Sequence, residues 1–141
     1  MKKGIVYDYK NWNEIEACVS MLVEKILEKK LSFRSISTIS RGGLVPARLV
    51  ADRLGLKQIL VDPGTIPADS LFVDDIYDTG ETFRKMIQCA DDPDHLVYAT
   101  LFARRKKSYP SQLVYAKMTK NTEYIVYPWD RFEHGVSYES H

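Results

Sequence analysis

One ten-residue segment constrains the fold of this chain more than any other feature. Residues 73–82 read VDDIYDTGET. The apolar residues at its start predict a strand over 71–75 that ends in two carboxylates, and an apolar pattern over 81–90 predicts a helix after the small-residue turn. A strand, a polar turn and a helix in direct succession are typical of α/β proteins. In such proteins ligands bind at the carboxyl ends of the parallel strands.

The rest of the chain alternates in the same way. Apolar residues at helical spacing predict one helix over 12–30 and a second over 44–54, the second with Pro46 in its first turn and Gly55 after its end. Shorter apolar or alternating runs predict further strands over 35–40, 57–61, 96–103, 112–116 and 124–127. This order predicts a single α/β domain over residues 1–141, with a mainly parallel, twisted sheet flanked by helices.

Composition excludes several classes of protein. Hydrophobic residues make up 45% of the 141 residues, too many for a disordered chain, and a net charge of +1 argues against nucleic-acid binding. No apolar run is long enough to span a bilayer, and the N-terminal residues do not resemble a signal peptide. Cys18 and Cys89 match no metal or redox spacing, so we expect free thiols in a cytoplasmic protein.

The residue types in 73–82 suit a phosphorylated sugar and a hard cation. The Asp74 and Asp75 carboxylates can accept hydrogen bonds from vicinal sugar hydroxyls and can hold Mg²⁺. The turn 78–82 can aim backbone N–H groups at a phosphate: Gly80 permits close approach, and two threonines add hydroxyl groups. An isolated Asp-Asp pair would more often be a loop or helix-cap feature. The whole string points instead to binding.

A second segment has similar properties. Residues 40–46 read SRGGLVP and also follow a predicted strand and open a predicted helix. Backbone amides and the Arg41 guanidinium there can form an anion site. Taken alone, the segment could be only a turn. Its position about thirty residues before Asp74 makes it informative.

Together the two segments resemble the signature of the type I phosphoribosyltransferases, and SRGGLVP is typical of the bacterial xanthine-guanine subgroup. The resemblance implies that the paired acids bind the ribose hydroxyls of phosphoribosyl pyrophosphate, that the turn binds its 5′-phosphate, and that the loop at 40–43, which often carries a non-proline cis peptide, binds its pyrophosphate with Mg²⁺. The implied ligand-binding residues are Ser40, Arg41, Gly42, Gly43, Asp74, Asp75, Asp78, Thr79, Gly80, Glu81 and Thr82. Asp78 and Arg41 are the implied catalytic residues.

The resemblance extends from Gly4 to Asp130 and implies a base site. Arg104 stands where the family has a lysine that donates to the 6-oxo group of a purine. Tyr124 stands where an aromatic residue stacks on the base, and Ile125 would offer its backbone to the 2-position. Asp130 is a candidate ligand of a second Mg²⁺, beside Asp74 and Asp75.

One departure bears on activity. The family usually has a long hood or flexible loop between the strands that here flank 62–70, so we expect a shortened hood. The expected function is transfer of a phosphoribosyl group to guanine, xanthine or hypoxanthine by a homo-oligomer, a dimer or tetramer. Two alternatives stay open: a sensor that binds phosphoribosyl pyrophosphate without base transfer, and a phosphoribosyltransferase for another base.

Overall fold

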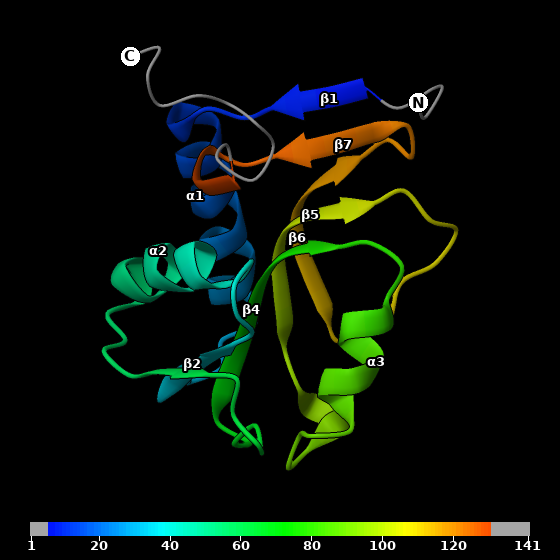
Figure 1. Ribbon diagram of the computed structural model, residues 1–141. Helices are drawn as coiled ribbons and strands as arrows, with labels where there is room; N and C mark the ends of the chain where they lie inside the picture. Colours follow the sequence, from blue (N-terminus) through cyan, green and yellow to red (C-terminus); the bar gives the residue numbers. More distant parts are fainter. Residues whose placement is uncertain (1–5, 131–141) are drawn as a thin grey trace.

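The chain folds into a five-stranded sheet, three helices and a smaller two-stranded sheet (Figure 1). The computed structural model describes residues 6–130. The elements are β1 (Val6–Tyr9), α1 (Trp12–Glu28), β2 (Ser35–Thr38), α2 (Leu44–Leu54), β3 (Ile59–Val61), β4 (Ser70–Tyr77), α3 (Glu81–Ile87), a 3₁₀ turn (Pro93–His95), β5 (Tyr98–Arg104), β6 (Leu113–Thr119) and β7 (Glu123–Val126).

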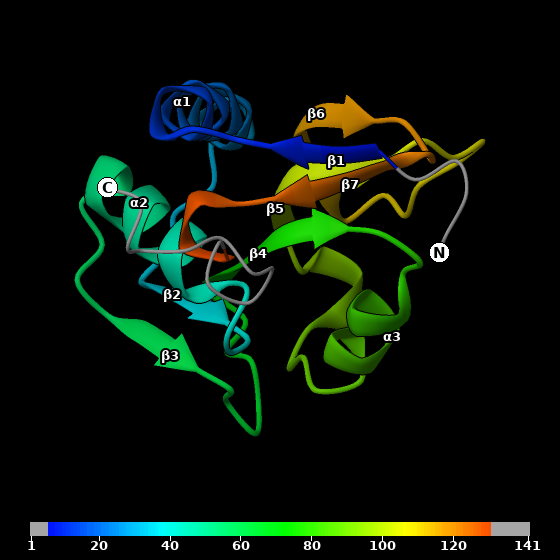
Figure 2. The same ribbon diagram turned by 45° about the horizontal axis from the view of Figure 1, so that its top comes forward.

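The larger sheet has the strand order β3-β2-β4-β5-β6, and every neighbouring pair is parallel. Helices α1 and α2 cover one face, and α3 covers the other (Figure 2). The central strands β4 and β5 are therefore buried on both sides, which explains their nearly continuous apolar sequences. The predicted fold class is confirmed: a mostly parallel sheet flanked by helices.

The smaller sheet pairs the first and last strands of the described chain. Strands β1 and β7 run parallel, with Val6 opposite Glu123 and Tyr9 opposite Val126. The pair crosses the end of the larger sheet at which β4, β5 and β6 finish (Figure 1). It thus lies on the side where parallel sheets bind ligands.

The predicted boundaries agree with the structure where local signals are strong. Helix α2 has the predicted bounds, because Gly55 ends it in the left-handed conformation at φ 70°. The strand predicted to end at Asp75 instead continues to Tyr77, since Ile76 and Tyr77 still pair with β5. Helix α3 ends at Ile87, earlier than the predicted residue 90.

The structure also bears on two predictions made from composition, that the cysteines are free thiols and that no segment spans a membrane. Both cysteines are free, Cys18 within the core and Cys89 half-buried. Within residues 6–130 no helix combines the length and apolarity that crossing a bilayer requires.

Candidate functional site

Strand β4 places its two adjacent carboxylates on opposite sides of the sheet. Successive strand residues alternate between faces, and the two residues before the acids follow this rule, since Val73 packs beneath α1 and α2. Phe72 packs in the cluster beneath α3, and Asp74 lies on that side, where it lines a cavity of about 130 Å³ with the 78–82 turn. Asp75 also lines this cavity, and it reaches a second one beside the 40–43 loop. Two loops therefore meet on one pair of acids.

Asp74 is buried and held by a tyrosine. The Tyr98 hydroxyl donates to Asp74 Oδ2 at 3.4 Å, and the Asp75 N–H donates to Asp74 Oδ1 at 2.8 Å. Burial raises the pKa of Asp74, and these hydrogen bonds only partly oppose the effect. The Tyr98 ring is itself fixed, because it stacks on Phe72 with 4.8 Å between the ring centroids.

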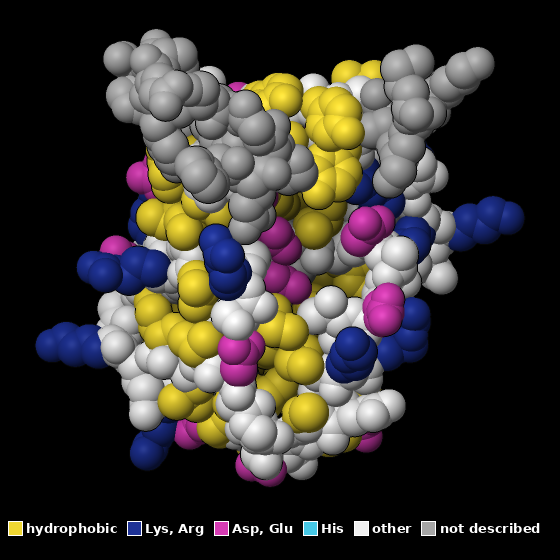
Figure 3. Space-filling view, in the orientation of Figure 1, with side chains coloured by type: hydrophobic (Ala, Val, Ile, Leu, Met, Phe, Trp, Pro, Cys, Tyr) yellow, Lys and Arg dark blue, Asp and Glu magenta, His cyan; other side chains and the backbone are white. Residues whose placement is uncertain are grey.

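Asp75 faces the glycine loop at very close range. A Cβ atom on Gly42 would lie 2.9 Å from Asp75 Oδ2, so only glycine lets the loop approach the carboxylate this closely. The pKa of Asp75 is raised well above its usual range, first by burial and then by the Asp74 charge, with Asp130 adding to it. Figure 3 shows acidic side chains gathered in a hollow near the middle of this face. Carboxylate oxygens gathered in this way are the ligands that a hard divalent cation prefers.

The turn after β4 is built around a glycine in the left-handed conformation. Gly80 adopts φ 87°, a conformation that favours glycine, and a Cβ there would lie 2.7 Å from the Tyr77 hydroxyl oxygen. The Glu81 N–H donates to Thr79 Oγ1 at 3.2 Å. Arg84 of α3 donates to the Thr79 carbonyl at 3.4 Å and brings a cation beside the turn. Asp78 and Thr79 are exposed, whereas Thr82 is half-buried.

The 40–43 loop is fixed at both ends. At its start, Ser40 donates from its backbone N–H and from its hydroxyl to the Asp62 carboxylate, at 2.8 and 2.5 Å. These hydrogen bonds lower the pKa of Asp62. At its end, Gly43 lies against β2 and β4, where a Cβ would come within 2.0 Å of Thr38 Oγ1. The Ser40–Arg41 peptide bond is cis.

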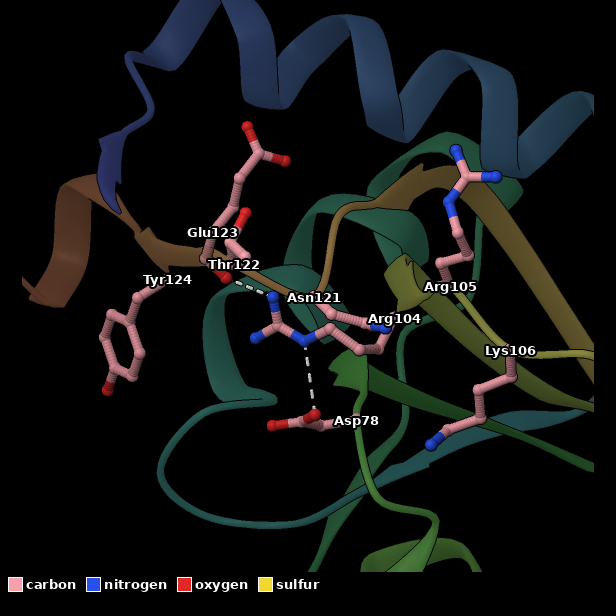
Figure 4. A pocket seen from close by; sticks show the side chains of 8 residues that line it. All are labelled: Asp78, Arg104, Arg105, Lys106, Asn121, Thr122, Glu123 and Tyr124. Carbon is pink, nitrogen blue, oxygen red and sulfur yellow. Dashed lines mark hydrogen bonds and ion pairs between the residues drawn. The ribbon is translucent and has the colours of Figure 1, made fainter. Parts of the chain in front are cut away.

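Arg104 lies at the end of β5 and joins two parts of a further pocket, of about 410 Å³ (Figure 4). Its Nε donates to Asp78 Oδ1 at 3.2 Å. Its Nη1 donates to the carbonyls of Lys120, at 2.9 Å, and Glu123. The remaining terminal nitrogen points toward the side of the pocket where Tyr124 lies (Figure 4). Sequence reasoning placed Arg104 near a base but did not foresee its pairing with Asp78.

Tyr124 and Asp130 border the third cavity, which links the pocket of Arg104 to the glycine loop. This cavity, of about 510 Å³, is lined by Arg41, Gly42, Leu44, Val45, Asp75, Tyr124, Trp129 and Asp130. The Tyr124 side chain is 42% exposed, and its ring meets Tyr7 of β1 edge to face, with 5.6 Å between centroids. Ile125 is buried beside it on β7, so it can offer only its backbone to a ligand. The structure thus brings all the predicted site residues to one end of the sheet.

Comparisons with known proteins agree with this geometry. No family model matches the chain. Two curated relatives are both named xanthine-guanine phosphoribosyltransferase. The one from Chromohalobacter salexigens is 28% identical, over 91% of this chain and 85% of the relative. The one from Gluconobacter oxydans is 25% identical, over 84% and 82%. A solved xanthine-guanine-hypoxanthine phosphoribosyltransferase from Helicobacter pylori superposes with a TM-score of 0.78 at 16% identity, over 96% of this chain and all of that one.

The chain has the type I phosphoribosyltransferase fold. The resemblance that the motifs indicated, to the xanthine-guanine phosphoribosyltransferases, is confirmed by the two relatives over most of their length. The names of these relatives describe pentosyl transfer to purines, a glycosyltransferase reaction.

Three residues that support the site escaped sequence reasoning. Asp62 holds Ser40, Tyr98 holds Asp74, and the Tyr127 hydroxyl donates to the Asp75 carbonyl at 3.2 Å. Each acts on a residue 22 to 52 positions away in the sequence. No local pattern encodes such pairings. Tyr98 alone had a signal, since a tyrosine in an otherwise apolar central strand needs a partner for its hydroxyl.

Proposed function

We propose that this protein transfers the 5-phosphoribosyl group of phosphoribosyl pyrophosphate to a 6-oxopurine base, forming a nucleoside monophosphate and pyrophosphate. The observation that carries the proposal is the convergence of the 40–43 loop and the 78–82 turn on Asp74 and Asp75. Such an arrangement suits a ligand with an anion at each end and hydroxyl groups between them. The names of the two curated relatives support transfer to a purine.

The acidic residues fit Mg²⁺. Asp74 and Asp75 offer hard oxygen ligands. Burial raises the pKa of both carboxyls, and the Asp74 charge raises that of Asp75 further, so a bound cation would favour their ionised forms. Asp130, which borders the cavity beside Asp75, is the candidate ligand of a second ion. When bound, magnesium would neutralise the charge that develops on the departing pyrophosphate.

The protein's own groups divide the remaining work. Within the 40–43 loop, the backbone around Arg41 and Gly42 and the Arg41 guanidinium bind the pyrophosphate and stabilise it as it leaves. Residues 78–82 hold the 5′-phosphate, so the sugar is anchored at both ends. Attack by the base nitrogen on the sugar C1 then needs no protein nucleophile, and positioning supplies most of the rate. Asp78 borders the base pocket and accepts the proton that the attacking ring nitrogen loses.

Arg104 is proposed to read the 6-oxo group. Two of its nitrogens are held by protein acceptors, and the third points toward the Tyr124 side of the pocket. A fixed cationic donor favours an oxo group over an amino group at this position. Tyr124 stacks on the base, and the Ile125 backbone meets the 2-position.

Other properties of the chain follow from the same proposal. We propose that residues 1–141 form one phosphoribosyltransferase domain, and that the enzyme acts in the cytoplasm as a homodimer or homotetramer. Its partners are then phosphoribosyl pyrophosphate, a purine base and Mg²⁺. Light scattering on the purified protein tests the assembly.

A second candidate function rests on the short connection between β3 and β4. Only residues 62–69 lie there, and Ile66 is tied down by a bridge to Ala90. A short, tethered connection is a poor lid, and without a lid, water can reach the reacting sugar. A sensor that binds phosphoribosyl pyrophosphate without base transfer would need no lid.

Pyrophosphate release from magnesium phosphoribosyl pyrophosphate separates the candidates. Guanine, xanthine, hypoxanthine, adenine, uracil and orotate are tested in parallel, beside a double Asp74→Asn/Asp75→Asn variant. Release that requires a 6-oxopurine and disappears in the variant is the expected result. Tight binding of the sugar pyrophosphate with no release for any base would support the sensor. Release with adenine, uracil or orotate alone would indicate an enzyme for another base.

A further inference from the structure

Asp62 is the first residue of the short connection between β3 and β4, and it touches the proposed pyrophosphate loop. Its carboxylate accepts both hydrogen-bond donors of Ser40, the backbone N–H at 2.8 Å and the hydroxyl at 2.5 Å. Both residues are exposed, so burial does not force this contact. The contact is instead a specific, charge-assisted pairing of one carboxylate with one residue.

The backbone of Asp62 is shaped for this contact. Asp62 adopts φ 49°, a left-handed conformation that residues other than glycine, asparagine and aspartate rarely take. Its N–H donates to the Thr38 carbonyl at 2.9 Å, which places the side chain beside the residues that follow β2. The end of β3 therefore aims Asp62 at the start of the neighbouring loop.

The loop needs an anchor at that end. Its other end is secured by packing, because Gly43 lies in contact with Thr38 and the Val73 carbonyl. Ser40 has no comparable packing, and among the described contacts its fixed donors all end on Asp62. Between these two ends lie Arg41 and Gly42, which border the cavity of Asp75.

We propose that Asp62 is a positioning residue for the proposed reaction: its carboxylate fixes Ser40, so that Arg41 and the backbone amides of the loop face the pyrophosphate. The inference rests on the proposed function and refines it in two ways. Ser40 acts through its contact with Asp62 and donates neither hydrogen to the ligand. The shortened connection contributes an anchor for the neighbouring loop instead of a lid.

Two substitutions that remove the same charge test this inference. Asp62→Gly suits the left-handed backbone but removes both acceptors. Asp62→Asn also suits that backbone, and its amide oxygen still accepts the Ser40 N–H while its NH₂ group can donate to the hydroxyl oxygen. A difference between the two variants therefore reports the hydrogen bonds and not the lost charge.

We expect Asp62→Gly to raise the KM for magnesium phosphoribosyl pyrophosphate about tenfold, the effect of losing hydrogen bonds to a charged group. The KM for the base should stay within about twofold, and Asp62→Asn should stay within about threefold of the wild type in both constants. Thermal melting of each variant checks that the fold is retained. Equal impairment of the two variants, or a wild-type KM in Asp62→Gly, would overturn the inference.

Amide hydrogen exchange separates this inference from the proposed function, because it requires no ligand. The Ser40 N–H should exchange faster in Asp62→Gly than in the wild type or in Asp62→Asn. Unchanged Ser40 exchange would overturn the anchor even in an active enzyme. Conversely, the proposed reaction would be refuted if the wild type released no pyrophosphate with any of the bases. Ser40 exchange would then still decide whether Asp62 fixes the loop.

Discussion

At the scale of single residues, the two acids that suit a cation also lower the stability of the folded protein when no cation is bound. Asp74 is buried and the adjacent Asp75 is half-buried, and burial is the first cause that raises the pKa of each carboxyl. In the unfolded chain both carboxyls would ionise near their usual value of 3.8. Folding must then confine two negative charges near each other, at a cost in free energy that a bound cation would offset.

We therefore expect Asp75→Asn to stabilise the protein in magnesium-free buffer at neutral pH, by about 1 to 2 kcal/mol. The pKa of Asp75 is raised by folding, so its protonation favours the folded state at low pH, and this advantage is lost as the pH rises through the raised pKa. Urea unfolding at pH 5 and pH 8 should show a gain for the variant that is larger at pH 8.

The exposed acid Asp91 provides a matched control for this experiment. Asp91→Asn removes one charge of the same sign and should change the free energy of unfolding by less than about 0.5 kcal/mol at either pH. A variant at position 75 that is less stable than the wild type at pH 8 would show that the Asp75 charge is already compensated within the protein.

At the scale of elements, the 40–43 loop is seated on β2 and β4 through a glycine. Thr38 donates from its hydroxyl to the Val73 carbonyl at 2.6 Å, and Gly43 fits against that hydroxyl oxygen. A side chain at this point must push the loop away from β4. The loop can therefore lie close to Asp75 only because Gly43 has no Cβ atom.

Gly43→Ala should destabilise the protein by about 1 to 3 kcal/mol, the usual effect of overpacking. The added Cβ would come within 2.0 Å of Thr38 Oγ1 and 3.0 Å of two backbone carbonyl oxygens. Gly64→Ala is the control, because a Cβ there meets nothing within 4 Å. Urea unfolding measures both, and equal effects at the two positions would show that the loop relaxes freely.

The same elements show how far local sequence determines structure. The bounds of α2 were predictable because Gly55 ends that helix through its own backbone conformation. The end of β4 was not, since Ile76 and Tyr77 extend the strand only by pairing with Phe102 and Ala103. The candidate site likewise has parts that could be predicted from the sequence and parts that could not. The motifs marked which residues would gather, but contacts such as Arg104 with Asp78 depend on the whole fold.

At the scale of the whole molecule, Arg104 links the two sheets. It ends β5 of the larger sheet, and its guanidinium donates to the carbonyl of Glu123, the first residue of β7. A second carbonyl, that of Lys120, holds the same nitrogen. The pocket proposed to bind the base lies at this junction, so its shape depends on how the two sheets are held together.

Arg104→Met should therefore loosen the junction as well as weaken base binding. We expect a loss of about 1 to 3 kcal/mol in the free energy of unfolding, faster amide exchange along β7, and at least a tenfold rise in the KM for the base. Lys107→Met, at an exposed position in the loop that follows β5, is the control and should change none of these quantities. Normal exchange in β7 with a raised KM would limit Arg104 to ligand contact.

The parallel pairing of β1 with β7 also has a mechanical consequence. If residue 6 and residue 126 were pulled apart, the two strands would slide along each other, since they run in the same direction from opposite ends of the described chain. All their mutual hydrogen bonds would bear the load together, instead of opening one after another. A pulling force on residues 6 and 126 would thus be borne by the strand pair that carries Tyr124 and Ile125, the residues proposed to bind the base.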